Sequence, residues 1–202
     1  MIDYTLQQFV LRLLAMVFIA AVHGFAVAGT ACALGDPGPR YDGRLTANPL
    51  AHLDVLGTLA GVFSLGWIRP IAIDPALLRF GRAGSVLVVG AGTAATLASV
   101  ALLRLVRPHL LPLLPDTASA LAFAVIETIG EVSLWFALVN VLPLPPLTGA
   151  HLLVAIAPGS RESLRQVQPY VAIALAALAI TGLAARVLAP AYVLLARVML
   201  GE

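Results

Sequence analysis

Lysine is absent from this sequence of 202 residues, and charged residues of any kind are scarce. They make up 11% of the chain, and all twelve basic residues are arginine. The net charge of +2 is too small, and too scattered, for a nucleic-acid-binding surface. The single cysteine, Cys32, excludes an internal disulfide and a CxxC site. Hydrophobic residues reach 60%, against about 45–50% in soluble domains, so the composition predicts a polytopic membrane protein.

Long apolar runs predict the membrane-spanning helices, because a helix needs about 20 mostly apolar residues to cross a bilayer. Such runs occupy residues 5–34, 84–106, 117–142 and 169–186, with a shorter final helix at 187–200. The run at 51–66 is short, which fits either a tilted span or a re-entrant element. The first run is longer than a signal-peptide core and lacks a basic leader, so we expect it to be retained. The sequence therefore predicts an all-α protein with about five to six transmembrane helices and a single domain over residues 1–202.

The segments between these runs are polar or rich in proline. We expect a Gly- and Pro-rich loop at 35–50, an interfacial segment at 67–83, a Pro-broken connection at 107–116 and a polar loop at 160–168. The stretch "PLPPLTG" at 143–149 cannot continue a helix, since proline lacks the N–H group and clashes with the preceding turn. A short apolar return follows it. Arginines occur on both alternating sets of loops, so their placement predicts no orientation.

Ionisable side chains at membrane depth are costly, and each is a candidate functional residue. The polar candidates are His23, Asp54, Glu127, Glu131, Asn140 and His151. Glu127 and Glu131 are four residues apart and therefore share a helix face. Three interpretations stay open for this pair: a proton relay or oxygen ligands that meet His23, a buried pair held neutral or matched to an arginine such as Arg12 or Arg104, and a polar contact to another subunit.

His23 begins the stretch "HGFAV", which invites comparison with the zinc motif H-E-x-x-H. That motif places two histidines on one helix face and a glutamate base between them. Here Gly24 stands at the glutamate position and Val27 at the second histidine. A single histidine without its partner is not a zinc site, so a histidine satisfied by helix packing is the favoured interpretation. The alternative is a lone ligand completed from elsewhere in the chain.

Four stretches in order resemble the site-2 protease family of intramembrane zinc metalloproteases, in particular its compact bacterial branch without a PDZ domain. They are "HGFAVAGTACALGD" (23–36), "GRLTANPLAHLDVLGTL" (43–59), "GWIRPIAIDP" (66–75) and "NVLPLPPLTGAHLL" (140–153). The second is similar to the branch's G-R-x-T-x-N-P-x-x-H-x-D-x-x-G-T signature. The fourth is similar to N-x-L-P-x-P-P-L-D-G-x-x-L. The resemblance covers nearly the whole chain and implies a site-2-protease-like core.

The departures from the family pattern fall on its chemistry. The resemblance implies that two histidines of H-E-x-x-H and the aspartate of the L-D-G stretch hold zinc, and that the glutamate activates water. In this sequence His23 matches the first ligand, while Gly24, Val27 and Thr148 replace the base and the other two ligands. His23 therefore looks like the remains of a metal ligand. Without the metal or the base we expect no peptide hydrolysis at a useful rate.

These observations predict a catalytically inactive homologue that works by binding, as a structural, accessory or assembly subunit of a larger membrane complex. Its expected partners are transmembrane helices of other membrane proteins, with no zinc or other cofactor and no nucleic acid. The predicted contact surface is the groove near His23, Asn140, Thr148 and His151, together with the Glu127 and Glu131 face. The resemblance implies a multi-pass protein of a bacterial cytoplasmic membrane. Two alternatives stay open: an active zinc metalloprotease with a rebuilt site of His23, Glu127 and Glu131, and a small proton- or ion-handling protein that uses both glutamates and Asp54.

Overall fold

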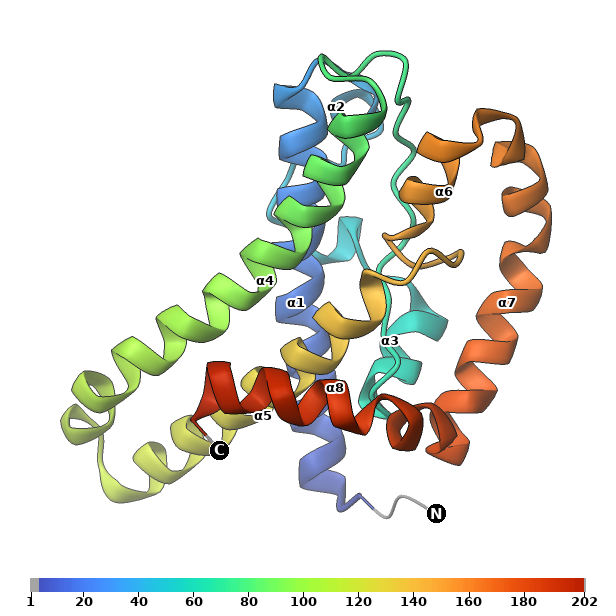
Figure 1. Ribbon diagram of the computed structural model, residues 1–202. Helices are drawn as coiled ribbons and strands as arrows, with labels where there is room; N and C mark the ends of the chain where they lie inside the picture. Colours follow the sequence, from blue (N-terminus) through green and yellow to red (C-terminus); the bar gives the residue numbers. More distant parts are fainter. Residues whose placement is uncertain (1–3, 202) are drawn as a thin grey trace.

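A computed structural model describes residues 4–201, and every regular element in that part of the chain is helical (Figure 1). The α-helices are α1 (Leu6–Ala33), α2 (Gly38–Tyr41), α3 (Val55–Val62), α4 (Arg82–Leu110), α5 (Asp116–Asn140), α6 (Ala150–Ile156), α7 (Arg161–Thr181) and α8 (Leu183–Leu200). Short 3-10 turns, η1 (Pro49–Ala51), η2 (Leu111–Leu113) and η3 (Pro158–Ser160), connect some of them. The all-α prediction is confirmed.

Within the described residues, five helices are long and apolar enough to cross a membrane: α1, α4 with η2, α5, η3 with α7, and α8. This agrees with the predicted polytopic membrane protein. In lipid, a helix satisfies its backbone hydrogen bonds within the segment itself, so apolar runs of this length form helices wherever they lie in the fold.

Helix α1 lies at the centre, and α4 and α5 pack against it (Figure 1). Its buried side chains include Met16, Ile19 and Val27, which share a core with Val88 of α4 and Phe136 of α5. Small residues on α4 allow a close approach to α1. A Cβ atom on Gly92 of α4 would lie 2.6 Å from Val27 Cγ2 and 2.8 Å from His23 Cε1. The helices therefore touch closely at the level of His23.

The short apolar run at 51–66 folds as a re-entrant element, because α3 has only 8 residues and extends about 12 Å. Asp54 caps its first turn: its carboxylate accepts hydrogen bonds from the Gly57 N–H (2.7 Å) and from the indole N–H of Trp67 (3.1 Å). Asp54 is thus a structural cap that joins two of the sequence motifs. These hydrogen bonds account for its position without a role in moving protons or ions. After α3 the chain turns at Ser64, which has φ 81°.

The prediction that residues 67–83 lie at the interface is wrong for the first part of this segment. Residues 67–74 are extended, and Trp67, Ile68, Ile71 and Ile73 are buried in the core. The prolines at 70 and 75 prevent a helix, and alternation along the extended chain turns Ile71 and Ile73 inward while Ala72 faces out. The segment therefore runs through the molecule rather than along its surface.

The predicted polar loop at 160–168 is helical: α7 begins at Arg161. Polar side chains three and four residues apart support this first part of α7, where Glu162 accepts hydrogen bonds from Arg165 (2.9 and 3.0 Å) and Gln166 (3.1 Å). Helix α7 then continues past the proline at 169 to Thr181. Its end is set by Gly182, whose φ of 68° is left-handed.

The prediction that the proline-rich stretch at 143–149 ends a helix is confirmed, and the turn that it forms positions Thr148. Helix α5 ends at Asn140, and the turn that follows contains a cis peptide bond between Pro145 and Pro146. Gly149 closes this turn, where a Cβ atom would lie 2.3 Å from the carbonyl oxygen of Leu142. The chain then reverses into α6. This turn places Thr148 beside α1.

Candidate functional site

His23 lies fully buried in the middle of α1 and contacts two threonines from distant parts of the chain. Its Nδ1 atom is 3.1 Å from Thr96 Oγ1 in α4, and its Nε2 atom is 2.9 Å from Thr148 Oγ1 after α5. The edge of the ring packs on Phe136, with centroids 4.9 Å apart. Both ring nitrogens thus have a hydrogen-bond partner inside the protein.

The threonine hydroxyls determine the tautomer of this histidine. Thr96 Oγ1 donates to the carbonyl of Gly92 (2.9 Å), so it accepts a hydrogen bond from Nδ1–H of His23. Nε2 is then the acceptor, and the hydroxyl of Thr148 donates to it. The lone pair that a metal ligand would offer is occupied by Thr148. This arrangement is the satisfied, packed histidine that the sequence favoured.

Asn140 holds Thr148 in place. Its Nδ2 donates to the carbonyls of Gly66 (2.8 Å) and Phe136 (3.0 Å), and its Oδ1 accepts from the backbone N–H of Thr148 (3.4 Å). The carbonyl of Asn140 accepts from the N–H of Gly149 (2.8 Å). A hydroxyl bonded to an imidazole resembles a nucleophile and its base. Here, however, the backbone N–H groups of Thr148 and Gly149 are already bonded, so neither is free to stabilise an oxyanion.

Replacing Thr148 by valine is expected to destabilise the protein by about 1–3 kcal/mol, because Nε2 of buried His23 loses its donor. A shift in the thermal unfolding midpoint in mild detergent measures the effect. The matched control is Thr181→Val, which removes an exposed hydroxyl at the end of α7 and should leave the midpoint almost unchanged. A midpoint for Thr148→Val equal to that of the control would contradict the described hydrogen bond.

His52 fills the space next to Gly24. A Cβ atom on Gly24 would lie 2.2 Å from His52 Nδ1 and 2.4 Å from its Cγ. His52 is fully buried, and its Nε2 is 2.8 Å from the carbonyl oxygen of Thr46. Burial lowers the pKa of His52, which favours the neutral ring. The sequence shows His52 in its N-P-x-x-H stretch, but no local signal reveals its contact with Gly24.

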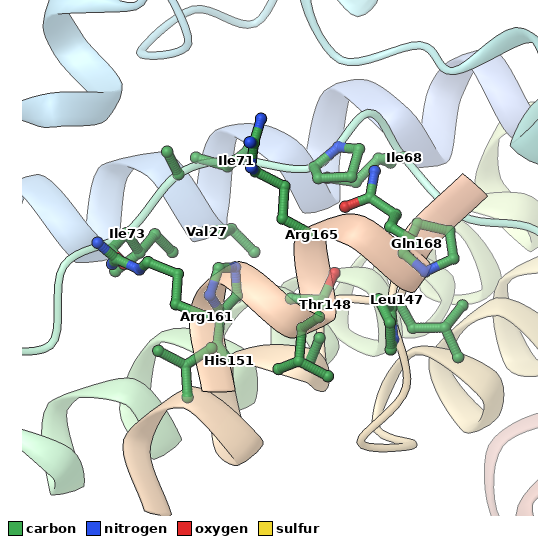
Figure 2. Close-up of a pocket in the computed structure, with 17 residues that line it drawn as sticks. Val27, Ile68, Ile71, Ile73, Leu147, Thr148, His151, Arg161, Arg165 and Gln168 are labelled. Atoms are coloured by element: carbon green, nitrogen blue, oxygen red, sulfur yellow. The ribbon is translucent and has the colours of Figure 1, made fainter. Parts of the chain in front are cut away.

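A cavity of about 310 Å³ opens beside these residues, between the extended segment, the proline turn, α6 and the start of α7 (Figure 2). Val27 and Thr148 lie on its wall, so both positions at which the motif resemblance implied ligands reach it. The remaining lining is mostly apolar, with Arg161 and Arg165 on one side. His151 also lines the cavity, where burial and then the charge of Arg161 lower its pKa to about 4, so it is neutral near pH 7.

Glu127 and Glu131 lie away from His23 and pair with arginines. Glu131 Oε1 is 2.8 Å from Nη1 of buried Arg12. Glu127 contacts Arg107 directly, and its other oxygen is 3.8 Å from Arg104. The geometry therefore matches the arginine-paired interpretation of both glutamates.

The residues around His23 do not fit a zinc ion. Among the described residues, no three His, Cys, Asp or Glu side chains are grouped so that they could hold a metal. The alternative set of His23, Glu127 and Glu131 is thus not brought together. A hydroxyl and a valine stand beside His23 where zinc would need two further ligands.

Comparison with known proteins agrees with the resemblance seen in the motifs. The chain is 32% identical over 192 residues to a Bacillus subtilis protein named "Putative zinc metalloprotease YwhC". The aligned region covers 93% of this chain and 88% of that protein. No family model matches the chain, and no solved structure matches it. Because the identity extends over almost the full length of both proteins, the chain belongs to the same family as this relative, whose name is consistent with a site-2-protease-like family.

Proposed function

We propose that this protein is a catalytically inactive member of its family that acts by binding a membrane segment of another protein. The observation that carries the proposal is the hydrogen bond from Thr148 to Nε2 of His23. It occupies the one retained ligand nitrogen, while Gly24 and Val27 supply neither a base nor a second ligand.

The chemistry of zinc hydrolysis supports this proposal. A catalytic zinc site uses three protein ligands and an open position for water, and the metal makes that water nucleophilic near neutral pH. A general base contributes a further 10²–10⁴-fold, roughly. At this position the chain offers His23, whose ring nitrogens are both hydrogen-bonded, and among the described residues no group of three possible ligands surrounds it.

The cavity supports a binding role. The extended segment forms one wall, and within the described residues the N–H groups of Ile71 and Ala72 donate no hydrogen bond. An extended peptide recognises such an edge through main-chain hydrogen bonds, while its side chains enter neighbouring pockets. The expected ligand is therefore a stretch of a partner's membrane segment that is apolar and locally unwound. The proposal places this complex in a bacterial cytoplasmic membrane, with the chain as a structural, accessory or assembly subunit.

A photo-crosslinking amino acid at Ala72 tests the proposal in native membranes. Ala72 is exposed and lines the cavity, so its replacement perturbs no core contact. Ala98, an exposed alanine on α4 that does not line this cavity, is the matched control. We expect one defined membrane protein to crosslink at position 72 and not at 98. Equal crosslinking at both positions, or crosslinks to lipid alone, would overturn the binding role.

Zinc content separates this proposal from an active protease. We expect purified wild-type protein to contain far less than one zinc per chain, and the amount not to change in His23→Ala. The positive control is the double variant Val27→His and Thr148→Asp, which restores a three-ligand set at His23 and is expected to gain about one zinc per chain. Wild-type zinc near one per chain that His23→Ala removes would show that the site is a metal centre.

A further inference from the structure

Both ends of α8 lie at the same end of the molecule, although α8 is long and apolar enough to cross a membrane. Its first residue, Leu183, follows directly on α7 after the turn at Gly182. At its last residue, the carbonyl oxygen of Leu200 accepts a hydrogen bond from the guanidinium of Arg104 in α4. The first residue of α8 therefore lies at the depth where α7 ends, and its last residue lies at the depth of Arg104 in α4.

The first residues of α4 and α7, Arg82 and Arg161, mark the opposite end, because both line the same second cavity. Along its axis α4 advances about 33 Å from Arg82 to Arg104, and α7 advances about 30 Å from Arg161 to Thr181. Each distance is about the thickness of the hydrocarbon core. Thr181 and Arg104 thus both lie roughly one bilayer away from the starting end, and α8 joins them.

A spanning α8 would carry Leu200 about 27 Å back towards the start of α4. Instead, α8 runs crosswise over α5 and α1 near the end of the molecule where α1 begins (Figure 1). Its packing fits this course. Tyr192 stacks on Trp135 of α5 with ring centroids 4.3 Å apart, and Leu200 lies against Gly130 of α5.

The sequence of α8 presents three different faces to its surroundings. One face packs on the protein through residues such as Leu188, Leu195, Ala196, Met199 and Leu200. A second face is apolar and exposed, and consists of Leu183, Val187, Leu194 and Val198. A third carries Arg186 and Arg197, both exposed and eleven residues apart, which places them on one stripe three turns apart. In a helix that crosses hydrocarbon, two exposed arginines on one stripe are energetically costly.

We propose that α8 lies in the plane of the membrane interface, with its apolar exposed face in the acyl region and its arginine stripe among the phosphate headgroups. This is the arrangement of an interfacial amphipathic helix, whose apolar face enters the boundary while basic side chains stay in the polar layer. The partner of this surface is the lipid headgroup layer. Both ends of α8, and with them Gly201, then lie on the side of the membrane where α1 begins.

Cysteine accessibility tests this placement, because Cys32 is the single cysteine and can be replaced by serine. Arg186→Cys and Arg197→Cys are introduced one at a time into that background. Sealed vesicles of each orientation are then treated with a membrane-impermeant maleimide. We expect both positions to react in the same vesicle orientation. The reference variant is Tyr41→Cys in α2, at the opposite end of the molecule and 81% exposed, which should react only in the other orientation.

Two further variants make the test independent of the arginines. Thr181→Cys and Gly201→Cys bracket α8, and both should react from the side that labels positions 186 and 197. Leu194→Cys, on the lipid-facing stripe, should react several-fold more slowly than Arg197→Cys. Labelling of positions 186 and 197, or of 181 and 201, from opposite sides would show that α8 crosses the membrane and would overturn the proposal. If the two arginine positions react from neither side, the proposal is also overturned, because the stripe would then not lie among the headgroups.

Discussion

Replacing Gly24 by alanine is expected to destabilise the protein by about 3 kcal/mol, which is large for one added methyl group. The new Cβ atom would lie 2.2 Å from Nδ1 of His52. The imidazole has little room to move, since His52 is fully buried and its Nε2 contacts the carbonyl of Thr46. Overpacking of this kind costs about 1–3 kcal/mol and occasionally more. The unfolding midpoint in mild detergent measures the loss.

The matched control is Gly90→Ala, on α4, where an added Cβ meets no atom within 4 Å. That change should be neutral or slightly stabilising, because alanine favours a helix interior over glycine. The double variant Gly24→Ala and His52→Ala should recover much of the lost stability, since it removes the ring that the methyl group strikes. If Gly24→Ala matched Gly90→Ala, His52 would not fill the space beside position 24.

The second large effect is expected for Arg12→Met, at about 3 kcal/mol, the upper part of the cost of leaving a buried acceptor without its charged donor. Arg12 is 3% exposed and joins three elements. Its Nε donates to the carbonyl of Val62 (2.6 Å), Nη1 to Glu131 (2.8 Å) and Nη2 to Ser64 (3.4 Å). Methionine replaces the volume of the stem but leaves the carbonyl and the carboxylate without their donor. Because this contact anchors the end of α3, the re-entrant element should loosen first.

The midpoint of unfolding, and protease sensitivity around α3, measure the effect of Arg12→Met. Arg165→Met is the control, since Arg165 is 75% exposed and pairs only with Glu162 on its own helix; its midpoint should hardly move. Glu131→Gln should cost less than Arg12→Met, because Glu131 is 43% exposed and glutamine still offers an oxygen acceptor. A midpoint for Arg12→Met like that of Arg165→Met would mean that Arg12 does not anchor α3.

The sequence by itself determined the membrane helices and the residues that stand one and four positions after His23. Apolar runs became α1, α4 and α5 because a helix in lipid closes its hydrogen bonds within the run. Proline stopped α5 for an equally local reason. The departures of Gly24 and Val27 from the H-E-x-x-H pattern can be read directly, since their spacing from His23 is a property of one helix.

Only the tertiary structure decided what these positions became. His23 and Thr148 are 125 residues apart, and His52 reaches Gly24 from a separate loop. Glu131 finds Arg12 across 119 residues rather than joining His23. The extended segment around Ile71 is buried although its arginines suggested an interface. Contacts of this kind depend on how segments distant in the chain pack together. The hydrogen bonds within a single helix do not specify which distant segment packs against it.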